Sequence, residues 1–401
     1  MTTLKDHFHL TKDVFTIDPI SPEDAGVYFG RQPVEQRLID RMQMDFASRN
    51  VPKFFIFGRY GAGKTHTLAH LRHVLASDQF ADFPATEPLL TSLPPMRSKD
   101  TWVKLHEHFI DVIGRSRVKD AVLAVVGNSA STDPVEAIFE AGVLQYGDAS
   151  LQESQAQIFR ALIFRGVQET KAWEWLKGKA LSADDAAMLE TQTNLTTVPD
   201  FVNALLNVAR LVAIGLEKKI VLLIDEAEVI GSVRNDDSVD EFRHAFRELA
   251  EDKNSDLGFI TAFQMEASAM AESEVFSYDA ISSRLGFEAA YIDLADLVFD
   301  DEDAKEFIYR VLAHLVDQEA AAKEIEDHGL ATDPSAFPFT PDAIDRIADF
   351  VMEDPDRRSP RQIISRMRDA VGKAWLRDRS STDIGLIDEE LVEEILFPDE
   401  G

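Results

Sequence analysis

The sequence predicts an α/β fold: a parallel sheet of five strands, a helical insert and a C-terminal helical lid. Three observations carry this prediction. Val51–His70 reads as a buried strand, a glycine-rich turn and a helix with apolar periodicity. Lys219–Ile224 is a second strand, and its nearly continuous apolar run is typical of a parallel sheet covered on both faces. Beyond residue 299 the apolar spacing is that of helices alone.

The glycine-rich turn matches the phosphate-binding pattern G-x-x-x-x-G-K-[ST] at every fixed position. Glycines in such a turn let backbone N–H groups point inward at phosphate oxygens, and the following helix adds its positive dipole end. We expect Lys64 to reach the β- and γ-phosphates of ATP and the Thr65 hydroxyl to ligate Mg²⁺. The predicted nucleotide-binding residues are Gly58, Arg59, Tyr60, Gly61, Ala62, Gly63, Lys64, Thr65 and His66.

Three histidines follow on the helix after the loop. His66, His70 and His73 share one face at i, i+4 and i+7 spacing. A metal site on this face is one interpretation, and a solvated helix face is the one we favour.

The strand Lys219–Ile224 runs directly into Asp225 and Glu226. The carboxyl end of a strand is where open α/β sheets bind their ligands. We expect Asp225 to hold Mg²⁺ through water and Glu226 to orient and deprotonate the water that attacks ATP. The alternative is a solvated acidic turn after an ordinary strand.

Composition narrows the function classes. The chain has 401 residues and no cysteine, which excludes disulfides, thiolate nucleophiles and zinc sites built on cysteine. Its net charge of −31 repels polyanions, so nucleic acid binding is expected to be weak or indirect. A high-salt host and an ordinary acidic protein both fit that charge. The apolar runs are too short to span a membrane and no signal peptide is apparent, so we expect a cytoplasmic location.

The remaining elements follow from apolar periodicity and from glycine and proline breaks. We expect an N-terminal arm (1–30), an ATPase core (31–298) with a helical insert (115–197), an acidic hinge at Phe299–Asp303 and a helical lid (299–401). Strands are predicted at Glu87–Leu93, Leu257–Phe263 and Glu288–Leu294. Helices are predicted at Gln32–Arg49, Pro199–Leu216, Val239–Ala250, Ala304–Asp317, Pro341–Met352 and Ser359–Arg377, with a short acidic helix after Ile387.

This order of parts resembles the AAA+ ATPases, a class of P-loop NTPases. It is most similar to the branch of origin-recognition-type replication initiators and their transposon-regulator relatives. The resemblance covers about Val27–Leu294 for the core and Ala304–Arg377 for the lid. Tyr28-Phe29-Gly30-Arg31 resembles the opening box of that branch, which implies that Tyr28 and Phe29 lie against the adenine.

Within the branch, two stretches resemble the ATP-binding proteins of BREX-type phage-defence systems. One is Trp173-x-Trp175-Leu176-x-Gly178 in the insert, and the other is the LLIDEAE sequence that ends at Glu228. The tryptophans also have an ordinary reading as core residues. The resemblance implies a partner complex in phage defence or mobile-element control.

The AAA+ resemblance also implies roles for three further residues. Gln264 would be the polar sensor after the fourth strand, with Thr261 as the alternative. Arg284 would be the arginine finger offered to a neighbouring subunit, and Arg361 the arginine sensor of the lid. Each can also be read as a surface or helix-capping group.

Three functions therefore compete. The first is an ATP-hydrolysing subunit that forms a homo-oligomer, as a ring or filament, and remodels a partner complex. The second is a nucleotide-dependent switch with negligible turnover. The third is a replication initiator or transposition regulator. Initiators usually continue into a winged-helix domain, whereas this chain ends at Gly401 with one short helix after the lid, which counts against the third.

Overall fold

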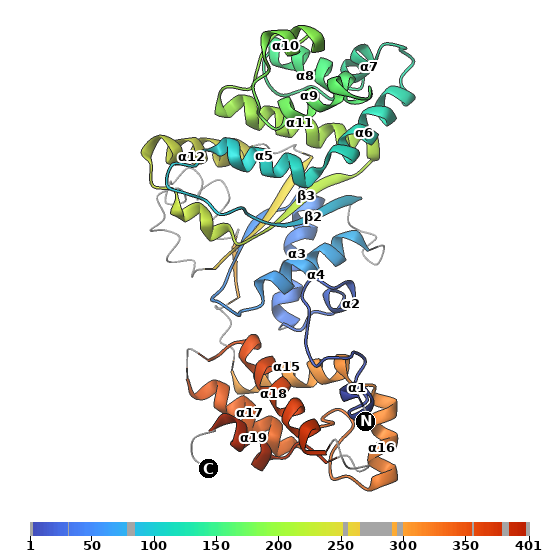
Figure 1. Ribbon diagram of the computed structural model, residues 1–401, viewed down its shortest axis with the longest axis vertical. Coiled ribbons are helices and arrows are strands. Elements are labelled where there is room, and N and C mark those ends of the chain that lie inside the picture. Colours follow the sequence, from blue (N-terminus) through green and yellow to red (C-terminus); the bar gives the residue numbers. More distant parts are fainter. Residues whose placement is uncertain are drawn as a thin grey trace. The chain divides into compact units, whose positions relative to one another are not determined.

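The computed structural model describes residues 3–30, 32–77, 85–251, 256–264, 291–294, 300–354, 357–378 and 385–397. The chain divides into two compact units (Figure 1). The sheet unit comprises Gln36–Phe57 and Leu68–Asp293. The lid unit comprises Met1–Glu35, Gly58–Thr67 and Leu294–Gly401. The glycine-rich loop thus belongs to the lid unit, although the strand that leads into it belongs to the sheet unit.

The sheet unit contains a five-stranded parallel sheet in the order β2-β3-β4-β1-β5, which confirms the predicted α/β fold class. The strands are β1 (Lys53–Phe57), β2 (Thr86–Ser92), β3 (Lys219–Asp225), β4 (Leu257–Phe263) and β5 (Tyr291–Asp293). Phe57 lies opposite Phe263 and Asp293, and Ser92 lies opposite Asp225. The carboxyl ends of all five strands therefore meet at one edge of the sheet.

Helices cover this sheet, since β1, β3 and β4 are buried along nearly their whole length, whereas β2 is half-buried. They are α3 (Gln32–Ala47), α4 (Lys64–Ala76), α5 (Trp102–Ile113), α11 (Val198–Leu216) and α12 (Asp236–Glu251). Figure 1 shows α5, α11 and α12 close to one another beside β3, and Trp102 packs edge-on against Phe242 and Phe246 of α12. Among the described helices, α11 alone has the length and composition to cross a membrane. More than half of it is buried among its neighbours, as in a core helix.

All the regular secondary structure in the predicted insert (115–197), which the structure describes in full, is helical. It consists of α6 (Arg115–Asn128), α7 (Pro134–Glu140), α8 (Ala149–Leu162), α9 (Val167–Leu176) and α10 (Ala183–Leu189). Trp175 is fully buried and its indole N–H donates to the Thr193 carbonyl at 3.0 Å. Gly178 has φ +89°, and a Cβ there would lie 2.7 Å from the Phe201 ring. The Trp-x-Trp-Leu-x-Gly stretch is therefore a packing anchor, in which Trp175 and Gly178 need their residue types for structural reasons.

The lid unit contains α1 (Leu4–His7), α2 (Pro22–Ala25), α15 (Asp301–Leu315), α16 (Gln318–His328), α17 (Pro341–Glu353), α18 (Pro360–Asp378) and α19 (Glu389–Leu396). Its core includes Phe8, Leu10 and Phe15 from the first 30 residues. The backbone bridge between Leu10 and Val316 joins the two parts of the unit. The sequence predicted residues 1–30 as a separate extended arm. In the structure they pack within the lid unit because their large apolar side chains are buried against α15 and its neighbours.

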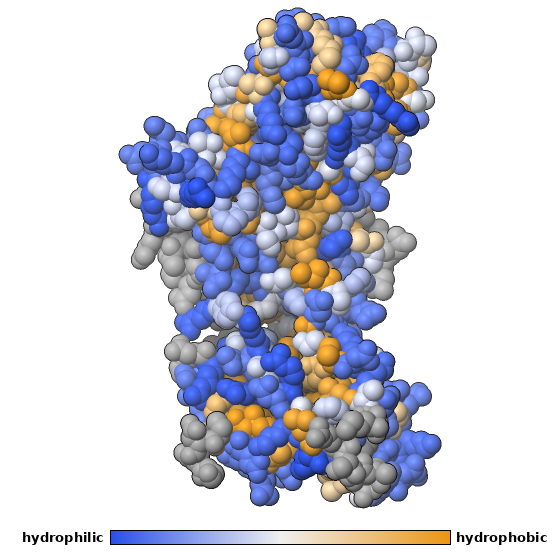
Figure 2. All heavy atoms as spheres, viewed as in Figure 1, coloured by the Kyte–Doolittle hydropathy of each residue, from blue (hydrophilic) through white to orange (hydrophobic). Residues whose placement is uncertain are grey.

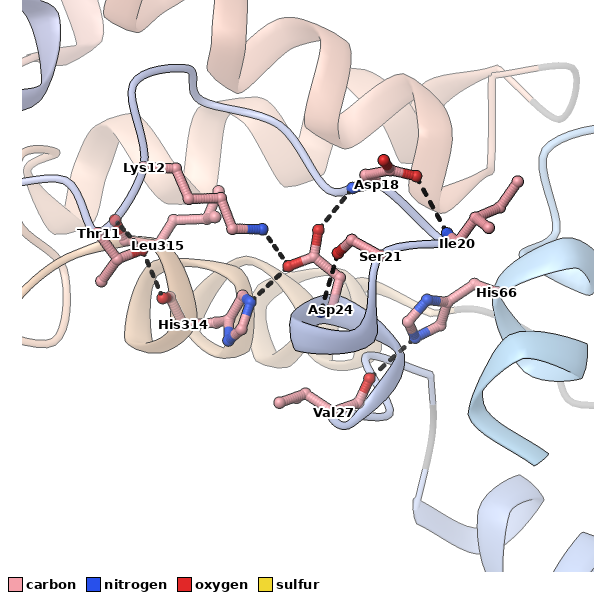
Figure 3. Close-up of polar contacts among 10 residues, drawn as sticks. All are labelled: Thr11, Lys12, Asp18, Ile20, Ser21, Asp24, Val27, His66, His314 and Leu315. Carbon is pink, nitrogen blue, oxygen red and sulfur yellow. Dashed lines mark hydrogen bonds and ion pairs between the residues drawn. The ribbon is translucent and has the colours of Figure 1, made fainter. Parts of the chain in front are cut away.

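A buried carboxylate fastens this N-terminal segment to α15 (Figure 3). Asp24 is inaccessible to solvent and accepts hydrogen bonds from the Lys12 ammonium, the His314 ring and the Asp18 N–H. Burial by itself raises the pKa of Asp24. The hydrogen bonds from Lys12 and His314 outweigh burial and hold the pKa below its usual value. The segment is thereby fixed by a buried carboxylate that a lysine ammonium, a histidine ring and a backbone N–H satisfy.

The acidic run predicted as a hinge caps a helix where the structure describes it, and its role as a hinge stays a prediction. Asp300 is the N-cap of α15 and forms a capping box with Asp303, so these carboxylates satisfy the first N–H groups of the helix. Phe299 lies outside the described residues. The helix α16 was not predicted, because its run of alanine and acidic residues carries few large apolar side chains to mark a face.

Candidate nucleotide-binding site

The glycine-rich loop has the backbone that its pattern predicts. Gly61 has φ +81° and Gly63 has φ +88°, a left-handed region that residues with a Cβ enter at a cost. The Ala62 N–H donates to the Arg59 carbonyl at 3.2 Å and closes a tight turn between them. Gly58 begins the loop, where a Cβ would come within 3.1 Å of the Ala62 Cβ. The loop is therefore shaped by glycine at three positions, for conformation or for space.

Lys64 lies inside this loop. Its side chain is buried, with an exposed fraction of 9%, and its ammonium donates to the carbonyls of Gly58 and Arg59 at 2.9 and 3.0 Å. The cation is thus held at the centre of the turn. This is the position from which a lysine can bind phosphate oxygens.

The helix α4 begins at Lys64, so its first turn carries the residues next to the loop. Thr65 is the second residue of α4 and is partly exposed. The Gly63 carbonyl accepts from both the N–H and the hydroxyl of Thr67, at 2.8 and 3.0 Å. Because α4 has 13 residues, its dipole places partial positive charge at the loop. Loop, lysine and helix start together form an anion-binding arrangement.

The predicted adenine-contacting residues lie beside the first turn of α4. Tyr28 is buried and its hydroxyl is 3.4 Å from the Thr67 hydroxyl oxygen. Burial raises the pKa of Tyr28 to about 12. Phe29 is also buried and belongs to the core of the lid unit. A Cβ on Gly30 would lie 2.6 Å from the Tyr28 ring, so glycine here makes room for the tyrosine.

His66 joins this aromatic group to the loop helix. Its ring stacks on Tyr28 at a centroid distance of 6.1 Å, lies 5.2 Å from Phe29 and hydrogen-bonds the Val27 carbonyl at 2.9 Å (Figure 3). The prediction of a solvated histidine face is wrong at His70, which is 4% exposed. His70 follows the apolar stripe of α4 closely enough to be buried with it.

Arg361 lies against the loop. Its guanidinium stands over the Tyr60 ring, 4.7 Å from the centroid, and donates to the Tyr60 hydroxyl. A Cβ on Gly61 would come within 3.1 Å of Ser359, the residue just before α18. The structure therefore brings the predicted sensor arginine of the lid to the phosphate loop.

The end of β3 presents the two predicted carboxylates. Asp225 is 7% exposed, and its Oδ1 accepts the Glu226 N–H at 2.9 Å. Glu226 is exposed and has φ +57°, in the left-handed region. It precedes a 3-10 helix at Ala227–Ser232. The strained turn directs the chain away from the strand and leaves the Glu226 side chain open to solvent.

The two candidates for the polar sensor occupy different environments. Gln264 is exposed just beyond β4, and its N–H donates to Glu228 Oε2 at 2.9 Å. Thr261 is 3% exposed inside β4, where it lies opposite Ile224 and Phe55. Only Gln264 stands at the edge where the strands end, which favours it over Thr261.

Arg284, the predicted arginine finger, lies outside the described residues. Sequence reasoning missed Glu228 as the group that fixes the chain after β4, and Tyr60 as the residue that receives Arg361. The acidic stretch after β3 was a signal for Glu228. Nothing in the sequence links Tyr60 with a residue 301 positions further along.

The donor atoms suit Mg²⁺ carried by phosphates. Thr65 and Asp225 offer a hydroxyl and a carboxylate, which are the hard oxygen ligands that Mg²⁺ prefers. Within the described residues no group of three or more histidine, cysteine or acidic side chains could hold a metal.

This chain is similar to solved structures in the order of its elements. No family model matches this chain, and no curated protein does. The Orc1 protein of Aeropyrum pernix, solved in complex with DNA, is similar at 12% identity and a TM-score of 0.44. The match covers 90% of this chain but 64% of that protein, so this chain spans less than two thirds of its length. The fold assignment therefore rests on this chain's own elements: a five-stranded parallel sheet, the helices beside it, and a further set of helices after β5.

Proposed function

We propose that this chain is an ATPase of the AAA+ type, which binds ATP with Mg²⁺ and hydrolyses it to ADP and phosphate. The observation that carries the proposal is the loop at Gly58–Thr65. Left-handed glycines, an inward-lying lysine and the start of a long helix come together there, at the end of a parallel strand. This combination satisfies phosphate charge through backbone N–H groups, an ammonium and a helix dipole at once.

The remaining roles follow from the order of the sheet. The strands β1 and β3 end at the same edge of the sheet, and in this proposal the residues that follow each of them act on ATP. In this proposal Lys64 binds the β- and γ-phosphates, and Thr65 and Asp225 hold Mg²⁺. Glu226 orients the attacking water and accepts its proton. Gln264 and Arg361 contact the terminal phosphate.

Substitution of the loop lysine tests the nucleotide site. We expect Lys64→Ala to abolish ATP binding, measured by isothermal titration calorimetry with Mg²⁺ present. The matched control is Arg72→Ala, which removes one positive charge from an exposed position on the same helix and should bind ATP as the wild type does. ATP binding by Lys64→Ala at the wild-type affinity would contradict the proposal.

We further propose that the subunit forms a homo-oligomer and receives Arg284 from a neighbour as an arginine finger. Such a residue is worth about 10³-fold or more in related phosphoryl-transfer enzymes. ATPase activity per subunit should therefore rise with protein concentration. A mixture of Arg284→Ala and Glu226→Gln proteins should regain activity, since some mixed interfaces pair an intact Glu226 with an intact Arg284. A mixture that forms oligomers yet stays inactive would exclude Arg284 as the finger.

The partner is proposed to be a protein complex of phage defence or mobile-element control. The Trp173-x-Trp175 anchor of the insert and the LLIDEAE strand are the residues that support this. Phage challenge of cells that carry the gene with its neighbours tests it. Protection that depends on Glu226 is expected, and equal plaque counts with wild type and Glu226→Gln would count against a defence role that needs hydrolysis.

The contact between Arg361 and the loop favours a second candidate, a nucleotide-dependent switch with negligible turnover. That contact ties α18 to the loop, so nucleotide binding alone can alter it. Steady-state phosphate release, with and without DNA, separates the two: clear turnover supports an ATPase, and tight ATP binding without turnover supports a switch.

A role as replication initiator or transposition regulator would require an encounter with DNA. The net charge of −31 leaves few faces able to release counterions, so we expect weak, non-specific binding with a shallow dependence on salt. Fluorescence anisotropy with a short duplex measures both quantities. A nanomolar Kd in physiological salt would instead favour the initiator role.

A further inference from the structure

Tyr60 is an exposed aromatic residue at a variable position of the phosphate loop. Its exposed fraction is 63%. Exposing an aromatic ring to water adds little to the stability of a tight turn. One ring face is covered by the guanidinium of Arg361, 4.7 Å from the centroid, and the same guanidinium donates to the ring hydroxyl. Two interactions thus join one side chain of the loop to one side chain of the lid helix α18.

The backbone beside Tyr60 reinforces this contact. A Cβ on Gly61 would lie 3.3 Å from the Arg361 Cβ and 3.1 Å from the Ser359 hydroxyl. The first turn of α18 therefore rests directly on the loop. Tyr60 contacts Arg361 through its ring, and Gly61 leaves space for Arg361 because it has no side chain. We call these two residues the seat of Arg361.

The contact with Tyr60 and Gly61 is what holds the Arg361 side chain in place. Within the described part of the chain no carboxylate lies within 4.0 Å of its guanidinium, although the chain holds 72 acidic residues. An arginine side chain has several rotatable bonds, and ordering it at a phosphate costs the freedom that those bonds carry. A ring that already restrains the guanidinium lowers this cost before the ligand arrives.

We propose that Tyr60 is a positioning residue: it holds Arg361 at the loop so that the guanidinium meets the terminal phosphate of ATP. This inference rests on the proposed function and adds a residue to it. A guanidinium and a phosphate form strong, bidentate, charge-assisted hydrogen bonds, so the phosphate is a better partner than the ring. ADP lacks that phosphate. Tyr60 therefore contributes to the preference for ATP over ADP and acts only through Arg361.

A double-mutant cycle with both nucleotides tests this. Tyr60→Leu removes ring and hydroxyl at an exposed position, and the affinity for ATP should fall about two- to fivefold, the range of an exposed cation–π contact. The affinity for ADP should stay unchanged. Tyr60→Phe keeps the ring and should fall between wild type and Tyr60→Leu. Arg361→Ala should weaken ATP binding about tenfold or more. The double variant should bind ATP no more weakly than Arg361→Ala alone.

The matched control is Arg358→Ala. Arg358 is exposed three positions before Arg361 and donates to the Met352 carbonyl. Among the described residues it makes no hydrogen bond or ion pair with the loop. The control removes the same charge near the start of α18 and should bind ATP and ADP as the wild type does. An equal loss of ATP affinity in this variant would mean that net charge, not position, matters, and would overturn the proposal.

Three other outcomes would also overturn it. Additive losses in the double variant would show that Tyr60 acts independently of Arg361. Equal losses for ATP and ADP would indicate general damage to the loop. Tighter ATP binding by Tyr60→Leu would mean that the ring withholds Arg361 from the phosphate. The proposed ATPase function is judged separately, since it fails only if the wild type does not bind ATP or if Lys64→Ala binds it equally well.

Discussion

The phosphate loop and the end of β3 both turn the chain through the left-handed region, but they do so with different residues. The loop uses Gly61 and Gly63, with φ +81° and +88°. The end of β3 uses Glu226, with φ +57°. Glycine enters this region freely, whereas a residue with a Cβ pays about 1–2 kcal/mol. In the loop, glycine is the residue type that this backbone conformation favours. After β3, glutamate is a residue type that the same conformation disfavours.

This difference in residue type indicates which position retains its side chain for chemistry and not for the backbone conformation. Glu190 and Glu217 also have positive φ, but they close the helices α10 and α11, where a left-handed residue ends a helix in an ordinary way. Glu226 instead follows a strand, at the sheet edge where α/β folds bind ligands. Strain retained at such a place, with a carboxylate facing solvent, points to function.

The largest expected effect tests whether that carboxylate does chemistry. Glu226→Gln keeps the shape of the side chain and removes its ability to accept a proton. We expect kcat for ATP hydrolysis to fall about 10²- to 10⁴-fold, the usual contribution of a general base, while ATP affinity stays near wild type. Phosphate release and calorimetry measure the two quantities. Hydrolysis at the wild-type rate would remove Glu226 from the mechanism.

A smaller effect is expected at the neighbouring carboxylate. Asp225 is proposed to hold Mg²⁺ through water, and loss of such an outer-shell partner typically costs 10- to 100-fold in metal affinity. Asp225→Asn should therefore raise the Mg²⁺ concentration that gives half-maximal ATPase activity by about tenfold or more. The measurement is a Mg²⁺ titration of activity at fixed ATP. An unchanged midpoint would assign the metal to other groups.

The loop side of the comparison is tested by adding a methyl group to each glycine. A Cβ at Gly63 meets nothing within 4 Å, so Gly63→Ala carries the conformational cost alone, and ATP affinity should fall about tenfold. Gly61→Ala adds a close approach to Ser359 and should cost more. If calorimetry ranked the two variants in the opposite order, contact with the start of α18 would not constrain the loop.

The smallest expected effect is a change in the free energy of unfolding when Glu226 is replaced. Glu226→Gly places the favoured residue type in the left-handed position and should raise the free energy of unfolding by about 1 kcal/mol, because relief of strain exceeds the entropy that glycine loses. Glu226→Ala is the control, since it removes the carboxylate and keeps the strain. Urea unfolding followed by circular dichroism compares the variants. Equal stability of the two would mean that Glu226 stores no strain.

The polarity of the surface and the composition of the chain do not locate these sites. The face in Figure 2 is predominantly hydrophilic, as expected for a chain with 72 acidic and 41 basic residues. Net charge bears on solubility and on which polyanions the chain repels. It does not distinguish Glu226 from any other carboxylate, whereas its place after a buried strand and its left-handed backbone do.

The sequence by itself determined the sheet and its helices. Apolar runs marked β3 and β4 nearly to the residue, since a strand buried on both faces must be apolar throughout. The phosphate loop was equally predictable, because its backbone needs glycine and its chemistry needs Lys64 and Thr65 at fixed spacing. Asp225 and Glu226 were found as the residues that follow a buried strand.

Only the tertiary structure decided what lies next to these residues. Phe8 and Phe15 show in the sequence as groups that need burial, but the surface that buries them is formed some 300 residues later, by α15 and its neighbours. The AAA+ resemblance pointed to Arg361, but only the fold shows that its guanidinium lies over the Tyr60 ring. Local sequence patterns indicate which side chains need burial or a charged partner. The partners they find depend on chain segments that meet only when the protein folds.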